Sequence, residues 1–266
     1  MAMNGVTEQY TSGNLLERVF EGLRAVGKDP DNLTVGDLAP VDHFHTLGAS
    51  ATTGLADAAG LKEGDEVLDA GCGLGGPART LAETYGCRVT GIDLTPEFCE
   101  AAAELNRRVG LDDKIVIQQA NALALPFGDD TFDVVWTMHV SMNIEDKAEL
   151  YDQFARVLKP AGKLAFFDLI AGEGDLHFPV PWANDPAINH LVDEDELRLL
   201  LSTAGFHAEM WEDLTAEGAD FFRSQVPSPL GVQLLGTDMK PKLMNLARNL
   251  AEGRVRAIRS VCSYPG

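Results

Sequence analysis

Four glycines lie close together in the stretch Val67–Gly76, which reads VLDAGCGLGG. The stretch joins a short apolar run to an amphipathic one, as the turn between a strand and a helix does. Glycines in such a turn permit positive φ angles and let a ligand approach the bare backbone. Because a plain tight turn needs one glycine rather than four, the spacing of Gly71, Gly73 and Gly76 predicts a nucleotide-binding loop.

Two carboxylates narrow the choice of nucleotide. Asp93 ends the next predicted strand, twenty residues after Gly73, where an acidic side chain can accept hydrogen bonds from both hydroxyls of a ribose. Asp69 stands two residues before Gly71 and would repel the pyrophosphate of a dinucleotide held against the loop. It suits the cationic ammonium of S-adenosylmethionine, directly or through a water molecule. The sequence therefore favours S-adenosylmethionine over NAD as the ligand.

With these residues in place, the chain resembles the class I S-adenosylmethionine-dependent methyltransferases. It is most similar to the small-molecule group that includes ubiquinone/menaquinone and sarcosine/dimethylglycine methyltransferases. The matching blocks are Val67–Gly76, Val89–Phe98 (VTGIDLTPEF), Ala122–Trp136 (ALALPFGDDTFDVVW) and Arg156–Asp168 (RVLKPAGKLAFFD). The resemblance implies methyl transfer from S-adenosylmethionine to a small-molecule acceptor, on a seven-stranded sheet whose last strand is antiparallel.

The resemblance also implies which residues hold the cofactor. The family usually carries Asp where Asn121 stands, and Asn keeps a carbonyl acceptor for the adenine amino group. The segment that follows the fourth strand is expected to face the methionine part and the acceptor. The expected cofactor contacts are Asp69, Gly71, Cys72, Gly73, Asp93, Leu94, Asn121, Ala122, Thr137 and Met138.

Two histidines, His139 and His45, are the candidates for a catalytic role. Several relatives that methylate hydroxyls carry paired histidines where this chain has Met142 and Asn143. His139 lies three residues before Met142 and is as suited to shaping the pocket as to moving a proton. His45 belongs to a stretch that the family places over the cofactor. No metal site is predicted, because no Cys, Asp or Glu completes a convincing ligand set around the histidines.

Residues 172–190 are the predicted lid over the acceptor. Nineteen residues without regular structure are uncommon unless they have a function, although a packed connecting loop is the alternative. The lid is apolar and aromatic at Leu176–Trp182 and contains no Lys or Arg, which favours a neutral or cationic acceptor. The seven Lys and Arg residues from Arg223 to Arg259 keep an anionic acceptor open.

An amine nitrogen is thus the predicted acceptor, because it needs little help from a base. O- or C-methylation of a small aromatic or isoprenoid molecule is the alternative within the family. Outside it, the alternatives are an NAD-linked oxidoreductase and a protein that binds the cofactor without catalysis.

The amino-acid composition limits the number of domains, the kinds of partner and the location that we expect of this protein. The 266 residues are 45% hydrophobic, enough to bury the core of one domain, predicted over residues 1–266. The net charge of −20 disfavours nucleic acid and membrane partners. We find no signal-peptide pattern, no apolar run near the ~18 residues of a membrane span, and no CxxC pair among four cysteines. A cytoplasmic protein is therefore expected, and its oligomeric state is not predicted.

The elements that must position these residues alternate along the chain. Strands are predicted at 66–70, 87–93, 115–118, 132–137, 163–169, 206–211 and 254–263, and helices at 77–85, 146–158 and 240–252 and from Pro96 and Asp193. This alternation predicts an α/β, Rossmann-like fold with a mostly parallel sheet and helices on both faces. Residues 1–60 are predicted to form a helical N-terminal cap, with helices at 14–26 and 50–59 and a polar break at Gly27–Asp37 between them.

Overall fold

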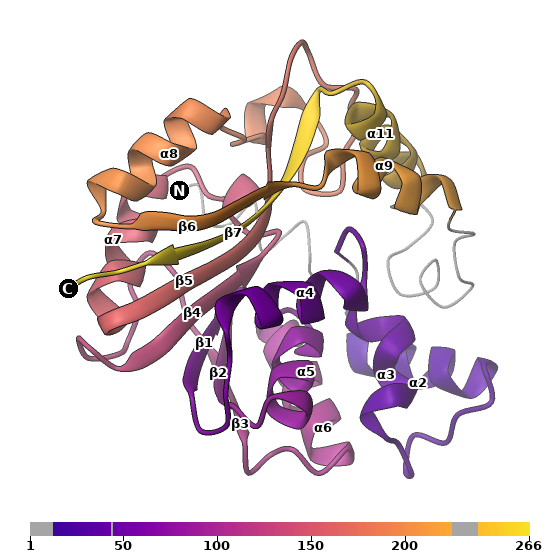
Figure 1. The fold of residues 1–266 in the computed structure, drawn as a ribbon. Helices are drawn as coiled ribbons and strands as arrows, with labels where there is room; N and C mark the ends of the chain where they lie inside the picture. Colours follow the sequence, from indigo (N-terminus) through magenta and orange to yellow (C-terminus); the bar gives the residue numbers. More distant parts are fainter. Residues whose placement is uncertain (1–12, 44, 225–238) are drawn as a thin grey trace.

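A single seven-stranded sheet forms the centre of the computed structural model, which describes residues 13–43, 45–224 and 239–266 (Figure 1). The strand order is β3-β2-β1-β4-β5-β7-β6. The strands are β1 (Glu66–Ala70), β2 (Arg88–Asp93), β3 (Ile115–Gln119), β4 (Phe132–Met138), β5 (Leu158–Ala171), β6 (His207–Asp213) and β7 (Val255–Ser263). β7 runs antiparallel to β5 and β6, and the other neighbouring strands are parallel. The predicted mostly parallel, Rossmann-like sheet and its antiparallel last strand are confirmed.

Helices cover both faces of this sheet. Those described are α2 (Leu15–Ala25), α3 (Val35–Asp42), α4 (Ala49–Ala59), α5 (Gly76–Thr84), α6 (Pro96–Arg108), α7 (Lys147–Val157), α8 (Glu194–Thr203), α9 (Thr215–Ser224) and α11 (Met239–Ala251), with short 3-10 turns η1 (Ser141–Asn143) and η2 (Pro186–Ile188). α4 and α5 lie on one face and α7 and α8 on the other (Figure 1). Each face has its own apolar cluster, with Leu55, Leu81 and Trp136 in one and Phe154 and Leu201 in the other.

Burial along the strands follows their place in the sheet. Every residue of β1 after Glu66 is buried, and in β4 only Asp133 is not. Such continuous burial is expected of central parallel strands that are covered on both faces. At the edge of the sheet the pattern relaxes, and Val116 of β3 is 60% exposed.

The N-terminal helices differ from the prediction in one respect. α2 and α4 lie where helices are predicted, but α3 begins inside the stretch predicted as a polar break. Thr34 and Asp37 explain this helix, because they form a reciprocal capping box in which Asp37 Oδ2 accepts the Thr34 backbone N–H at 2.9 Å. α2 and α3 share an apolar cluster with α6. The first twelve residues of the predicted cap lie outside the described residues.

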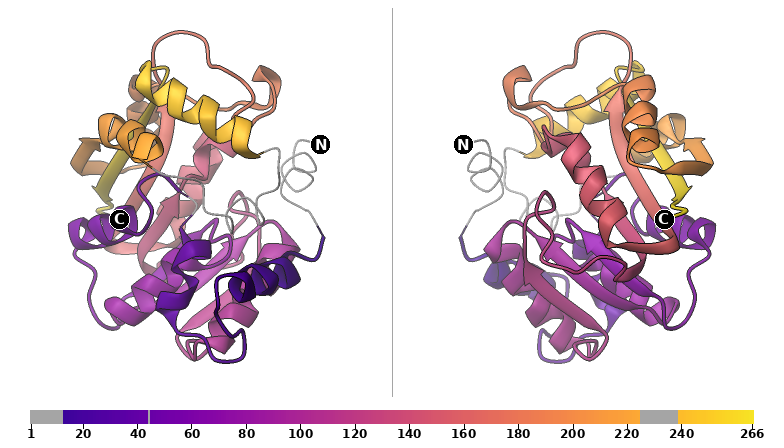
Figure 2. Two further views of the ribbon diagram at one scale, coloured as in Figure 1. Left: turned by 90° about the vertical axis from the view of Figure 1, so that its right-hand side faces the viewer. Right: turned by 90° about the vertical axis from the view of Figure 1, so that its left-hand side faces the viewer.

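α9 is a second helix that the sequence reasoning missed. It packs against α11 and the start of β7, and Figure 2 shows the yellow α11 at the opposite end of the molecule from the indigo α2.

Within the described ranges, no helix is long and apolar enough to cross a membrane. The predicted cytoplasmic location stays a prediction.

The topology determines where a ligand can bind. β1 pairs with β2 on one side and with β4 on the other, so the strand order reverses between β1 and β4. In open α/β sheets, ligands bind in the crevice at the carboxyl ends of the strands next to such a reversal. The glycine loop follows β1, Asp93 ends β2 and His139 follows β4, and these three strands end at this edge.

Candidate functional site

Two adjoining cavities open at this edge of the sheet. The larger, of about 380 Å³, is lined by residues that follow β2, β3 and β4, and the smaller, of about 220 Å³, by the glycine loop, the end of β4 and residues of α9 and α11. Gly71, His139 and Trp182 line both. These three residues therefore mark the place where the cavities meet.

Different structural requirements explain why the individual positions of the loop are occupied by glycine. Gly71 and Gly73 have φ angles of 83° and 53°, which L side chains rarely adopt. A Cβ on Gly71 would lie 2.3 Å from the Val140 side chain, and one on Gly76 would lie 1.9 Å from the Asp42 carbonyl oxygen. A Cβ on Gly73 would meet no atom within 4 Å. Gly71 and Gly76 thus permit close packing, while Gly73 leaves open space beside a cavity.

Asp69 is a buried carboxylate with one unsatisfied oxygen. It is 2% exposed, it lines the smaller cavity, and its Oδ2 atom has no hydrogen-bond partner among the described residues. Burial, and next the charge of Asp93, raise the pKa of Asp69 to about 7. An unpaired buried carboxylate is costly, so this position is suited to a ligand that carries a positive charge.

Asp93 lies in the wall of the larger cavity and shapes the loop. Its Oδ2 accepts the Gly73 backbone N–H at 3.1 Å and its Oδ1 accepts the Thr95 N–H at 2.9 Å. Each carboxylate oxygen can accept a further hydrogen bond, so the ribose hydroxyls expected here still find acceptors. Thr95 directly precedes α6, and its side chain makes no capping hydrogen bond. Burial raises the pKa of Asp93, and the hydrogen bonds from the backbone N–H groups of Thr95 and Gly73 oppose that rise.

The larger cavity also contains the residues expected around the adenine. Leu94, Asn121 and Ala122 all line it. Asn121 Oδ1 accepts the Leu123 backbone N–H at 3.0 Å, so this side chain also stabilises its own turn. One lone pair of that oxygen is left for an adenine amino group.

His139 combines a rare backbone conformation with an unpaired nitrogen. Its φ is 55°, an unusual value for a residue with a side chain. Its backbone N–H donates to Phe167 O at 2.9 Å, and its buried Nε2 has no hydrogen-bond partner within the part of the chain that the structure describes. Burial, and next the neighbouring His45, lower the pKa of His139 to about 3, so the imidazole is neutral at physiological pH. It can accept a hydrogen bond or donate one, depending on its tautomer.

His45 has a different environment, although its ring centroid is only 6.1 Å from that of His139. Its Nδ1 lies 3.3 Å from Thr46 O and its Nε2 lies 3.2 Å from Thr52 Oγ1. Burial lowers the pKa of His45 to about 4. Both nitrogens of His45 thus have partners within the protein, and the catalytic role expected of either histidine stays a prediction.

Of the remaining expected cofactor contacts, two line a cavity and one does not. Cys72 and Met138 line the smaller cavity, and burial raises the pKa of the Cys72 thiol. Thr137 lines neither cavity. Successive side chains of a strand point to opposite faces of the sheet, so the Thr137 side chain is buried on the face opposite to that of Met138. Within the described ranges, no three His, Cys, Asp or Glu side chains gather closely enough to hold a metal ion.

A buried ion pair beside the loop was missed by sequence reasoning. Arg79, 0% exposed, donates to both carboxylate oxygens of Asp42 at 3.1 and 2.6 Å and to Leu74 O at 2.6 Å. The pair fixes the end of α3 against the glycine loop. An arginine on the apolar face of the predicted helix at 77–85 was the available signal, since such a charge needs a buried partner.

The predicted lid is fixed at one end to α11. Asn249 Oδ1 accepts the His177 N–H at 2.9 Å, and Asn245 Nδ2 donates to Pro179 O at 2.9 Å. The indole N–H of Trp182 donates to Asn189 Oδ1 at 2.7 Å within the lid. The segment is therefore held in place over the junction of the cavities, with Trp182 in the wall of both.

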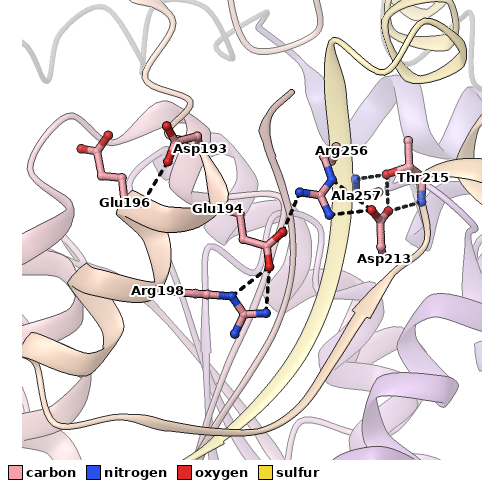
Figure 3. Close-up of polar contacts among 8 residues, drawn as sticks. All are labelled: Asp193, Glu194, Glu196, Arg198, Asp213, Thr215, Arg256 and Ala257. Atoms are coloured by element: carbon pink, nitrogen blue, oxygen red, sulfur yellow. Dashed lines mark hydrogen bonds and ion pairs between the residues drawn. The ribbon is translucent and has the colours of Figure 1, made fainter. Parts of the chain in front are cut away.

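A second polar cluster lies at the same edge of the sheet, around Arg256 of β7 (Figure 3). Arg256 donates to Glu194 at 2.6 Å and to Asp213 at 2.7 Å, and Glu194 also accepts from Arg198 at 2.8 Å. Asp213 caps the turn before α9 by accepting the Thr215 N–H at 2.9 Å. These residues bind one another, and their contacts join α8, β6 and β7.

The fold and site define a class of protein: an α/β protein with a nucleoside-binding crevice and a carboxylate placed for a cationic group. Residues 68–166 match the family model described as a methyltransferase domain. The chain is 32% identical over 218 residues to 2-methyl-6-phytyl-1,4-hydroquinone methyltransferase of Synechocystis, which covers 79% of this chain and 63% of that one.

Two further proteins extend the comparison. Glycine/sarcosine/dimethylglycine N-methyltransferase of Actinopolyspora halophila is 32% identical over 134 residues, covering 50% of this chain and 24% of that one. The solved geranyl diphosphate C-methyltransferase of Streptomyces coelicolor has the same fold, with a TM-score of 0.73 at 17% identity over 98% of this chain and 97% of that one.

The chain belongs to the class I S-adenosylmethionine-dependent methyltransferases, and the predicted family and cofactor are confirmed. Its matches span 57%, 64% and 63% of the length of three curated relatives.

Proposed function

We propose that this protein transfers the methyl group of S-adenosylmethionine to the nitrogen of a small, largely apolar amine. The observation that carries the proposal is the composition of the cavity walls. In the described part of the chain, the charged residues of these walls are all carboxylates: Asp42, whose charge Arg79 balances, and Asp69, Asp93, Glu145 and Asp146. Such walls attract cationic and neutral molecules and repel anionic ones.

The residues present fit the cofactor. Asp69 would pair with its ammonium group, Asp93 would accept from the ribose hydroxyls, and Asn121 with Ala122 would face the adenine. The unsatisfied Asp69 Oδ2 and the open space at Gly73 are the features of this chain that support that placement. When bound, S-adenosylmethionine supplies an electrophilic methyl group whose departure removes the positive charge from sulfur.

We place the acceptor in the part of the smaller cavity that faces α11 and the lid, and the methionine part of the cofactor at its glycine-loop side, beside Asp69 and Gly73. The cavity wall contains apolar side chains from α11 and the lid, such as Leu246 and Trp182, next to the neutral His139. With Nε2 unprotonated, His139 would accept a hydrogen bond from the acceptor N–H and aim the nitrogen lone pair at the methyl group. The N–C bond forms as the S–C bond breaks, and the proton leaves the product for water. Alignment and exclusion of water are the main contributions of the protein.

The low pKa of His139 separates nitrogen from oxygen acceptors. A hydroxyl acceptor needs a base whose pKa lies near the working pH, and a histidine with a pKa of about 3 is a weak one. A neutral amine brings its own lone pair and needs only to be oriented. The arginines that left an anionic acceptor open are paired, since Arg223, Arg248, Arg254, Arg256 and Arg259 each contact a carboxylate.

A labelled-methyl assay tests the proposal. The protein would be incubated with methyl-labelled S-adenosylmethionine and three matched panels: apolar amines, phenols of the same size, and prenyl diphosphates. We expect label on nitrogen and release of S-adenosylhomocysteine with the amines. Label on oxygen or carbon would contradict an amine acceptor and support the alternative, O- or C-methylation. Binding of S-adenosylhomocysteine without turnover of any panel would indicate a non-catalytic protein, and binding of NAD instead would indicate an oxidoreductase.

A further inference from the structure

Lys147 is a buried lysine outside the residues assigned to cofactor or acceptor. It is the first residue of α7 and is 4% exposed. Its Nζ donates to the carbonyl oxygen of Ile144 at 2.7 Å and to that of His190. One ammonium group therefore joins two chain segments that are far apart in sequence.

The position of Lys147 is unfavourable for α7 itself. A cation at the first turn of a helix opposes the helix dipole, and a buried charge is costly without compensation. Burial lowers the pKa of Lys147 to about 8, against the opposing effect of the Asp168 and Glu196 charges. The contacts that Nζ makes among the described residues are both to backbone carbonyl oxygens. The stabilisation of the ammonium thus comes mainly from the two carbonyl groups that it joins.

Both residues that accept from Lys147 belong to the wall of the larger cavity. Ile144 follows η1 and His190 ends the lid, and both line that cavity. The same two segments are joined again by the His190 N–H, which donates to Met142 O at 3.3 Å. On the inner side, Asp168 Oδ2 accepts the Ser141 N–H at 2.8 Å. The segment after β4 is therefore held between β5 and the lid, with Lys147 at its outer end.

We infer that Lys147 is a positioning residue that holds the lid against the segment after β4 and so sets the affinity for the cofactor. The inference rests on the proposed function, because it places the nucleoside part of S-adenosylmethionine in the larger cavity. Lys147 contacts neither cavity itself, so its effect passes through Ile144 and His190.

The test compares Lys147→Met with Lys163→Met. Lys163 is the control, because its Nζ also donates to a backbone carbonyl, that of Ala59 at 3.1 Å, and it lines neither cavity; it is more exposed than Lys147 and also lies 3.8 Å from Glu209. For Lys147→Met we expect the Kd of S-adenosylhomocysteine and the KM of S-adenosylmethionine to rise about tenfold, as for a lost hydrogen bond to a charged group. We expect kcat to stay within about threefold of the parent, and amide hydrogen exchange to accelerate at residues 141–144 and 188–190 only.

Lys147→Gln keeps an N–H donor on a shorter chain and should restore part of the affinity. It also serves if Lys147→Met does not fold. Unchanged affinity in a folded Lys147 variant, or equal losses in the Lys163→Met control, would overturn the inference. A parent protein that does not bind S-adenosylhomocysteine would instead contradict the proposed function, and the two failures are therefore distinguishable.

Discussion

Two polar clusters lie at the carboxyl edge of the sheet, and they differ in whether their buried polar atoms have hydrogen-bond partners. Around the glycine loop, Asp69 and His139 each bury a polar atom without a partner. Around Arg256, the Glu194 and Asp213 carboxylates bind arginine side chains and backbone N–H groups (Figure 3). A cluster that satisfies itself stabilises the fold, while a cluster with unsatisfied buried groups is prepared for a ligand.

Burial also separates the two regions. The Asp42–Arg79 pair beside the loop is fully buried, with side chains 2% and 0% exposed. The Asp213–Arg256 pair is 40% and 31% exposed. Removal of one partner from a buried pair leaves an uncompensated charge, whereas water replaces a lost partner at the surface.

The largest expected effect follows from that difference. Asp42→Ala should lower the free energy of unfolding by about 3–5 kcal/mol, because Arg79 is left buried and unpaired. Asp213→Ala, the matched control, should cost no more than about 1 kcal/mol. Urea unfolding monitored by circular dichroism measures both. Equal losses in the two variants would show that burial does not distinguish the clusters.

The second prediction concerns pH and Asp69. With a pKa of about 7 in the free protein, Asp69 is protonated at pH 5, and pairing with the cofactor ammonium must release that proton. Affinity for S-adenosylhomocysteine should therefore rise up to about tenfold per pH unit from pH 5 to 7 and level off above. Asp69→Asn should remove this dependence. A pH-independent Kd in the parent would contradict the pairing.

The same group affects stability in the opposite direction. Because the folded-state pKa of Asp69 is raised above its unfolded value, the stabilisation that it contributes is complete below about pH 4. It is lost as the pH rises through about 7. The free protein should thus lose stability over the range in which it gains affinity for the cofactor, and Asp69→Asn should reduce both trends.

The third prediction separates backbone strain from ligand contact. Gly73→Ala and Gly60→Ala both place a Cβ at a positive φ, of 53° and 68°, in open space. Each should cost about 1–2 kcal/mol of stability. Only Gly73→Ala should weaken S-adenosylhomocysteine binding, by about tenfold, because only Gly73 faces a cavity. Equal binding by both variants would exclude Gly73 from the cofactor contact.

The smallest effect is expected at His139. His139→Gln should lower kcat a few-fold, less than the ~10²–10⁴-fold typical of a lost general base. The rate should follow the pKa of the acceptor amine in parent and variant alike, since His139 does not titrate near neutral pH. A collapse of activity together with the loss of a titration near ~6.5 would identify His139 as a base and favour a hydroxyl or carbon acceptor.

The parts of the site that sequence predicted are those encoded locally. The glycine loop and Asp93 follow from spacing along consecutive elements, because a strand end determines where the next residues lie. Thr137 was expected at the site from its position after the fourth strand. Because side chains alternate along β4, the Thr137 side chain lies on the face opposite to that of Met138, away from both cavities. Sequence position alone did not determine that register.

The parts that were missed depend on contacts between distant segments. Asp42 and Arg79 are 37 residues apart, and Lys147 and His190 are 43 apart. Neither pairing leaves a local pattern, so an arginine or lysine among apolar residues indicated only that some partner exists. α3 was missed for a different reason, because its Thr34–Asp37 capping box lies in a stretch rich in Gly, Pro, Asp and Asn, which indicates a loop.

The most direct test of the central claim is calorimetric titration of S-adenosylhomocysteine into the parent, Asp93→Ala and Asp213→Ala. If the loop cluster holds the cofactor, Asp93→Ala should weaken binding by about 1.5–3 kcal/mol, or roughly 10- to 150-fold, as for lost hydrogen bonds to a charged group. Asp213→Ala should bind as the parent does. Parent-like affinity in a folded Asp93→Ala protein, or equal losses in both variants, would contradict the account.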